Sequence, residues 1–102
     1  MTEGLNQVAL ITGAGRGIGK AIAIELAKHH IFVYINYLSN NKAAQETLEN
    51  IIRNNGQAAL LPFDVTSTEE SLNAVKTILK KSPAIDILIN NAGIRNDTLL
   101  AM

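Results

Sequence analysis

The amino-acid sequence predicts an α/β fold built on a doubly wound parallel sheet. Four short apolar runs alternate with amphipathic stretches, which is typical of parallel strands joined by right-handed helical crossovers. A glycine-rich segment directly follows the first run, as in the strand-to-helix turns of such sheets. The third run contains Pro62, which has no N–H to donate and therefore places that strand at an edge. Together these observations predict the strand order 3-2-1-4.

The first half of the chain predicts two strands and two helices. The run from Val8 to Ile11 is continuously apolar, which favours a strand buried on both faces. Within residues 18–30, apolar side chains recur at helical spacing, and residues 31–37 are rich in β-branched and aromatic residues, so a helix and a second strand are expected. The apolar residues at helical spacing are Ile18, Ala21, Ile22 and Leu26.

A second helix is expected to begin after a cap at Asn40 or Asn41 and to run to Asn54. Its inward face is predicted to carry Leu48, Ile51 and Ile52. Gly56 is expected to end it in the left-handed conformation.

The second half predicts a third strand over residues 58–64 and a third helix that begins at Thr66 or Ser67. Ser82-Pro83 is expected to end this helix. A fourth strand is predicted over residues 85–89, and a further helix start near Asp97. The apolar stripe of the third helix is predicted to consist of Leu72, Val75, Ile78 and Leu79.

Composition narrows the class of protein. The 102 residues suit one domain, and nine basic residues balance nine acidic ones, which argues against nucleic acid or an anionic membrane as partners. Cysteine is absent, which excludes disulfides and thiolate metal sites. No apolar run approaches the roughly 20 residues of a membrane span. A cytoplasmic protein without a metal site is therefore expected.

The glycine-rich segment from Thr12 to Gly19 lies between the first strand and the first helix. Glycines let the backbone turn sharply and approach a pyrophosphate closely, and a helix N-terminus offers free N–H groups and a partial positive charge. The alternative is a glycine-rich connector that binds nothing. The residues of this segment predicted to bind a dinucleotide are Gly13, Gly15, Arg16, Gly17, Ile18 and Gly19.

Three motifs resemble the short-chain dehydrogenase/reductase family in their order along the chain. They are Thr-Gly-x-x-x-Gly-x-Gly from Thr12, Asp64-Val65, and Asn90-Asn91-Ala92-Gly93. The resemblance implies a Rossmann-type fold and a nicotinamide cofactor. It also implies that Asp64 contacts the adenine, although a helix-capping role is a rival, and that Asn90 bridges neighbouring strands or supports the sheet near the cofactor. The further cofactor-binding residues expected are Asn36, Tyr37, Asp64, Val65, Asn90, Ala92 and Gly93.

The end of the second strand favours NADP(H) over NAD(H). An acidic residue there would bind the ribose hydroxyls and repel a 2′-phosphate, but the sequence has Asn36-Tyr37. Arg16, inside the glycine-rich segment, is suited to a dianionic phosphate, and Lys42 adds a second charge. The alternative is that Arg16 is a solvated surface residue and Asn36 tolerates both cofactors.

No catalytic residue of the family is expected in this chain. The family's reductases use a Tyr-x-x-x-Lys pair, but Leu38 and Asn41 lie four residues after Tyr34 and Tyr37. A bare apolar fourth strand would also be an aggregation-prone sheet edge. Residues 1–102 are therefore expected to be the N-terminal, NAD(P)-binding half of a single Rossmann domain, from a protein whose catalytic half is absent here.

The residues after Gly93 resemble those of 3-oxoacyl-[acyl-carrier-protein] reductases within the family, through Ile94, Asp97, Leu99 and Leu100. This resemblance implies NADPH-dependent reduction of a 3-oxoacyl thioester carried by acyl carrier protein, by a homo-oligomer when the protein is full length. The alternatives are another short-chain dehydrogenase, such as an acetoacetyl-CoA reductase or a sugar or alcohol dehydrogenase, or a non-catalytic nucleotide-binding module.

Overall fold

A computed structural model describes residues 7–15 and 17–92 of the chain. The sheet is parallel, and its strands lie in the order β3-β2-β1-β4. The predicted α/β class and strand order are therefore confirmed. The elements along the chain are β1 (Val8–Ile11), α1 (Gly17–Lys28), β2 (Phe32–Tyr37), α2 (Asn41–Arg53), β3 (Ala58–Pro62), α3 (Thr68–Leu79) and β4 (Ile87–Ile89).

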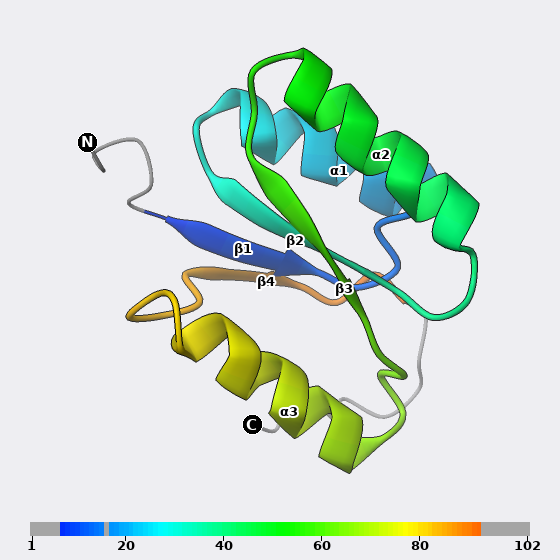
Figure 1. Ribbon diagram of the computed structural model, residues 1–102, viewed down its shortest axis with the longest axis vertical. Helices are drawn as coiled ribbons and strands as arrows, with labels where there is room; N and C mark the ends of the chain where they lie inside the picture. Colours follow the sequence, from blue (N-terminus) through cyan, green and yellow to red (C-terminus); the bar gives the residue numbers. More distant parts are fainter. Residues whose placement is uncertain (1–6, 16, 93–102) are drawn as a thin grey trace.

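Helices cover both faces of the sheet, with α1 and α2 on one face and α3 on the other (Figure 1). The alternation of side chains along β2 divides the core between the two faces. Val33 and Ile35 belong to the cluster that includes α1 and α2 residues. Phe32 and Tyr34 belong to the cluster that includes α3 residues, and their rings lie 5.0 Å apart. Each face of the sheet therefore has its own hydrophobic core.

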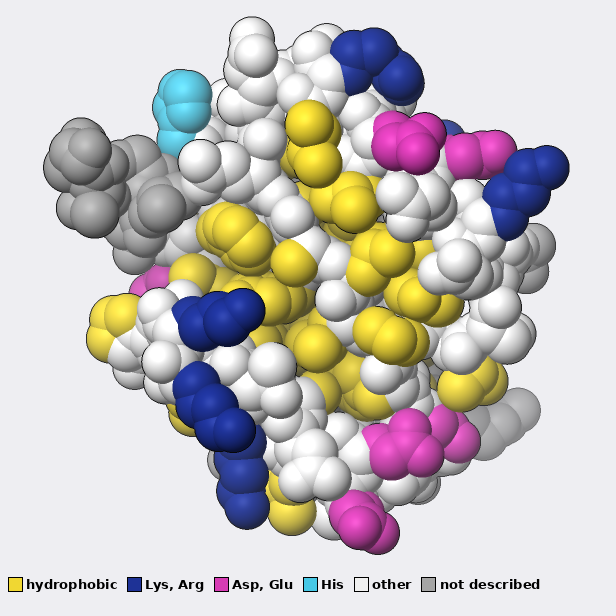
Figure 2. Space-filling model, viewed as in Figure 1, with side chains coloured by type: hydrophobic (Ala, Val, Ile, Leu, Met, Phe, Trp, Pro, Cys, Tyr) yellow, Lys and Arg dark blue, Asp and Glu magenta, His cyan; other side chains and the backbone are white. Residues whose placement is uncertain are grey.

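The two edges of the sheet differ from its centre in burial. All four residues of β1 are buried, whereas β3 and β4 contain only partly exposed or exposed residues. Pro62 ends β3 at one edge, as the sequence predicts. Figure 2 shows hydrophobic side chains at the surface between the α1–α2 layer and α3, where Figure 1 places β3 in front.

The inward faces of α2 and α3 differ in part from the prediction. Ile52, Leu72 and Leu79 are 55%, 42% and 47% exposed, so the expectation that they face inward is wrong. Polar residues take buried places instead, since Thr47 and Ser71 are fully buried. The Thr47 hydroxyl donates a hydrogen bond of 2.9 Å to the carbonyl oxygen of Gly15, which fixes α2 against the glycine-rich segment.

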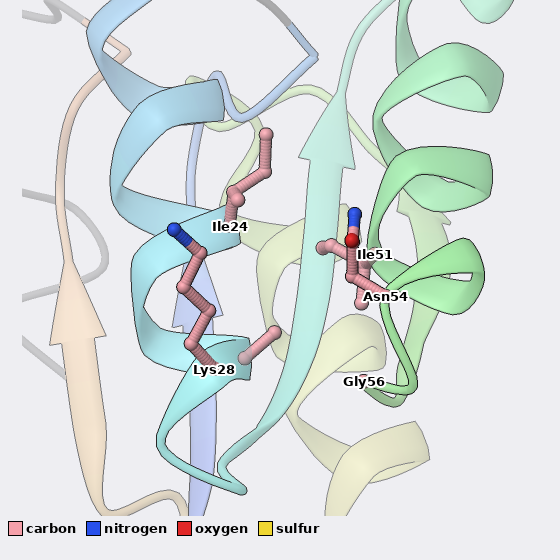
Figure 3. A pocket seen from close by; sticks show the side chains of 6 residues that line it. Ile24, Lys28, Ile51, Asn54 and Gly56 are labelled. Atoms are coloured by element: carbon pink, nitrogen blue, oxygen red, sulfur yellow. The ribbon is translucent and has the colours of Figure 1, made fainter.

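The end of α2 also differs from the prediction. Asn55 takes the left-handed conformation, at φ 68°, where Gly56 was expected to do so. Gly56 is required for close packing, because a Cβ there would lie 2.7 Å from Cγ2 of Ile51 and 3.1 Å from Cβ of Ala27. Figure 3 shows the shallow notch between the ends of α1 and α2, of about 10 Å³, which has room for about one water molecule.

The remaining boundaries fall within a few residues of their expected places. Helix α3 ends at Leu79, before the predicted Ser82-Pro83, and β4 begins at Ile87. Its N-cap is Ser67, whose side-chain oxygen accepts from the N–H of Glu70 at 3.1 Å. The helix start expected near Asp97 lies outside the described residues. None of the helices in residues 7–15 and 17–92 has the length and apolar character to cross a membrane.

Candidate functional site

A cleft of about 510 Å³ opens at the carboxyl ends of the strands. This is where parallel α/β sheets bind ligands, because the strand order reverses there and leaves a crevice. Loops that follow β1, β2, β3 and β4 all contribute to its walls. The residues that line it are Gly13, Gly17, Asn36, Tyr37, Leu38, Phe63, Asp64, Val65, Thr66, Asn91 and Ala92.

The N-terminus of α1 faces this cleft. Gly17 is the first residue of α1 and lines the cleft, so free N–H groups and the positive end of the helix dipole lie at its wall. No acidic residue stands in the first turn to neutralise that charge. A Cβ built on Gly17 would meet no atom within 4 Å. The space above the helix start is therefore free to hold an anionic group such as a pyrophosphate.

The glycine-rich segment packs closely against α1 and the end of β4. Gly13 turns the chain at φ 64°. A Cβ on Gly19 would overlap the carbonyl oxygen of Gly13 and would lie 2.6 Å from Nδ2 of Asn91. That amide nitrogen donates to the same Gly13 oxygen at 3.2 Å. The missing side chain of Gly19 thus lets the helix start, the segment and the β4 end meet.

Thr12 joins the ends of β1 and β4. The residue is fully buried, and its hydroxyl oxygen accepts from the backbone N–H groups of Asn91 at 2.8 Å and Ala92 at 3.0 Å. Its single proton is best placed toward Oδ1 of Asn90 at 3.2 Å, since the alternative acceptor, the carbonyl of Ile89, lies at 3.5 Å. Asn90 therefore takes the strand-bridging place that the sequence offered as one of its two roles.

Asn36 lies beneath the glycine-rich segment. Its side chain is 2% exposed, and its Oδ1 accepts from the N–H of Gly13 at 3.1 Å. Its Nδ2 donates to the carbonyl oxygens of Leu61 and Phe63 at 3.3 and 3.0 Å. The amide is thus engaged inside the protein, and Tyr37 and Leu38 form the cleft wall at the end of β2.

Asp64 follows β3 and forms a tight turn with Thr66. Its Oδ1 accepts from the Thr66 hydroxyl at 2.7 Å and from the Thr66 N–H at 2.9 Å. These two hydrogen bonds hold the pKa of Asp64 below its ordinary value of 3.8, so the carboxylate is charged near neutral pH. Asp64 does not cap α3, because Ser67 is the N-cap. The aspartate is left as an anionic group in the cleft wall.

Seven of the predicted cofactor-binding residues line the cleft, and four others lie outside its lining. Gly15 is buried with its carbonyl on Thr47, and Gly19 is buried beneath Gly13. Ile18 is 72% exposed in the first turn of α1, and Asn90 bonds Thr12. Arg16 and Gly93 lie outside the described residues. The seven in the cleft are Gly13, Gly17, Asn36, Tyr37, Asp64, Val65 and Ala92.

Sequence reasoning missed several residues of the site. Thr12 and Asn91 belong to recognised motifs, and their place beside the glycines was the available signal. Thr66 could have been found from the Asp-x-Thr spacing, which favours a side-chain turn. No such local pattern marks Leu38 or Phe63, whose places in the cleft depend on how β2 and β3 end.

Potential metal ligands are not clustered in the described part of the chain. In residues 7–15 and 17–92, no group of three or more His, Asp or Glu side chains is arranged to hold a metal ion. The two histidines follow α1, where His29 lies 3.3 Å from the Glu25 carboxylate.

Comparisons with known proteins agree with this geometry. The family model described as short chain dehydrogenase matches residues 7–101. A 3-oxoacyl-[acyl-carrier-protein] reductase from Synechocystis is 46% identical over 98% of this chain and 40% of that protein. The short-chain dehydrogenase/reductase homolog YusS from Bacillus subtilis is 41% identical over 88% of this chain and 83% of YusS.

A solved structure supports the same assignment. The crystal structure of a dehydrogenase/reductase from Sinorhizobium meliloti superposes with a TM-score of 0.82 at 32% identity, over 88% of this chain and 36% of that one. The chain thus spans well under half the length of the Synechocystis and Sinorhizobium proteins. The family match over residues 7–101, with the strand order and the glycine-rich helix start, shows that the chain belongs to the short-chain dehydrogenase family.

Proposed function

We propose that this chain binds NADP(H) in the cleft and supplies the cofactor-binding part of an oxidoreductase that reduces a 3-oxoacyl thioester carried by acyl carrier protein. The observation that carries the proposal is the start of α1 at Gly17, which faces free space within the cleft at the strand ends. A volume of about 510 Å³ is within the ordinary range for small-molecule sites, roughly 300–1,000 Å³.

The cleft has a suitable wall for each part of a dinucleotide: the pyrophosphate, the adenosine and the nicotinamide ribose. The pyrophosphate belongs at the N-terminus of α1, where N–H groups are free. Tyr37, Leu38, Asp64 and Val65 form the wall for the adenosine, and Ala92 lies at the β4 side for the nicotinamide ribose. When bound, the reduced cofactor would supply the hydride, while this chain orients it and excludes water from its phosphates.

Preference for the phosphorylated cofactor rests on charge. Residues 36–42 contain no carboxylate, so nothing in that stretch repels a 2′-phosphate. Lys42 is exposed in the first turn of α2, and Arg16 lies in the glycine-rich segment by sequence. A guanidinium can give a phosphate two charge-assisted hydrogen bonds.

The test of the cofactor proposal is calorimetric affinity for NADPH and NADH, in wild type and in Arg16→Ala. We expect wild type to bind NADPH more tightly, and the variant to lose roughly tenfold or more of its NADPH affinity while NADH affinity changes little, because one charge-assisted contact is worth about 1.5–3 kcal/mol. Arg53→Ala, at the far end of α2, is the matched control. A wild-type preference for NADH, or equal losses for both cofactors, would contradict the proposal.

The substrate part of the proposal rests on likeness to the Synechocystis reductase and on the residues after Gly93. Its test is NADPH-dependent reduction of an acetoacetyl thioester by the full-length protein. Absence of turnover with every 3-oxoacyl thioester tried would remove this substrate class and leave the cofactor proposal standing.

A nucleotide-binding module without turnover is the second candidate. The chain contains no Tyr-x-x-x-Lys pair, and YusS is a relative of similar length. Under this alternative the 102-residue chain binds NADPH but does not oxidise it in the presence of any carbonyl substrate. Its reading frame would then contain no downstream serine with a Tyr-x-x-x-Lys pair.

A further inference from the structure

We infer that Asn36 is a positioning residue that holds two walls of the cleft at a fixed spacing and thereby sets cofactor affinity without touching the cofactor. The inference rests on the proposed function, because it concerns the same cleft. It differs from a ribose-binding role for this residue, because the amide already donates both of its protons and accepts one hydrogen bond inside the protein, and the residue is only 2% exposed.

The contacts of Asn36 reach two chain segments, one on each side of β2. Its main-chain carbonyl accepts from the N–H of Ala14 at 2.9 Å, and its Oδ1 accepts from the adjacent N–H of Gly13 at 3.1 Å. Its Nδ2 donates to Leu61 and Phe63 on the other side. The orientation of the amide is fixed by its partners, because a backbone N–H can only donate and the two carbonyls can only accept.

These partners lie where the two walls of the cleft begin. Gly13 lies in the glycine-rich segment that leads to the start of α1, and Phe63 directly precedes Asp64 and Val65 on the opposite wall. The buried amide therefore ties the phosphate side of the cleft to the adenine side. Loosening it would change the distance between the subsites while leaving each of them intact.

Asn36→Asp tests the coupling because it alters one end of the bridge only. The aspartate keeps an acceptor for Gly13, but its second oxygen would face the carbonyl oxygens of Leu61 and Phe63. When protonated, that oxygen can again donate to one of them. Burial and the two carbonyls both favour the protonated form, so lowering the pH should restore the bridge.

The experiment measures NADPH affinity of Asn36→Asp relative to wild type between about pH 5 and pH 8. We expect a loss of roughly tenfold or more at the alkaline end, because the charged side chain no longer ties the β3 end to the glycine-rich segment, and recovery toward wild type as the pH falls. Asn73→Asp, the same change at an exposed site on α3, is the control and should match wild type throughout. Tyr37, Asp64 and Glu70, which lie in or beside the cleft, and the cofactor phosphate are present in all three proteins, so the comparison isolates residue 36.

The outcomes are distinct. An affinity of Asn36→Asp equal to wild type at every pH, or a loss that does not respond to pH, would overturn the inference. If wild type itself binds neither NADPH nor NADH, the proposed function fails first. Should the variant not fold, hydrogen exchange in wild type decides: a slowly exchanging Gly13 amide that is further protected by NADPH supports the bridge, and a freely exchanging one overturns it.

Discussion

Thr12 is surrounded by atoms that its hydroxyl can bond, although it carries no charge and lies outside the cleft lining. Thr12→Val keeps the shape of the side chain but leaves two backbone N–H groups of the β4 end without their acceptor. We expect a loss of roughly 1–3 kcal/mol in the free energy of unfolding, measured by urea denaturation. Thr12→Ser retains the hydroxyl and should lose only about 1 kcal/mol, for one buried methyl group. Equal losses in both variants would show that the hydrogen bonds add nothing.

The hydrogen bonds of the Asp64–Thr66 turn should make the stability of the protein depend on pH. Thr66→Val removes the hydroxyl donor and leaves the N–H donor, so the pKa of Asp64 should rise toward 3.8 while staying below it. A lowered folded-state pKa contributes stability that is present above the unfolded-state pKa and is lost as the pH falls through the folded value. The acid-induced loss of stability below about pH 4 should therefore be smaller in Thr66→Val. NMR titration of the Asp64 carboxyl checks this, with Thr68→Val as the control that leaves the pKa unchanged.

Individual residues of the site could be predicted from the sequence where they belong to a recognisable motif. Gly13, Gly17 and Asp64 stand in patterns whose spacing matches the turn they form. The role of Asn36 was not predictable, because its partners come from residues 23 to 27 positions away along the chain. Its position at the end of β2 identified the place, but its hydrogen bonds depend on the packed sheet.

At the scale of elements, two glycines at the junction of α1 with the glycine-rich segment differ in the space available for a side chain. Gly19→Ala places a methyl group against the backbone of Gly13 and the amide of Asn91, so α1 must move away from the segment. We expect a loss of about 2 kcal/mol or more in the free energy of unfolding and weaker NADPH binding. Gly17→Ala has open space for its methyl group and should cost about 1 kcal/mol, for the left-handed backbone alone. Urea denaturation of both variants checks the order, which would be contradicted by a larger loss at Gly17.

The elements themselves were largely predictable, but the faces of two helices were not. Ile51 and Ile52 are adjacent and lie about 100° apart around α2, so only one of them can face the sheet, and the structure buries Ile51. Periodicity alone could not choose between them, because a polar residue, Thr47, shares the buried face through its bond to Gly15. The same ambiguity between Ile78 and Leu79 explains the error in α3.

At the scale of the whole molecule, two apolar strands of similar sequence have different surroundings. β1 pairs with β2 and β4, and its residues are all buried. Within the described part of the chain β4 pairs with β1 alone, and its three residues are partly exposed. Nothing in Ile-Leu-Ile itself distinguishes a central strand from an edge, so the sequence predicted its apolar character but not its degree of burial.

The β4 edge is a surface through which copies of this chain could associate. An exposed apolar edge strand can pair with another chain, so the 102-residue chain should self-associate as its concentration rises, measured by sedimentation velocity. Ile87 belongs to neither core cluster, and Ile87→Lys should weaken association because a charged residue on an edge opposes pairing. Ile52→Lys adds the same charge at an exposed site on α2, which packs over β2 and β3 and away from the β4 edge, and should leave association unchanged. If wild type stays monomeric at every concentration, or if both lysine variants act alike, the β4 edge is not the surface through which copies of this chain meet.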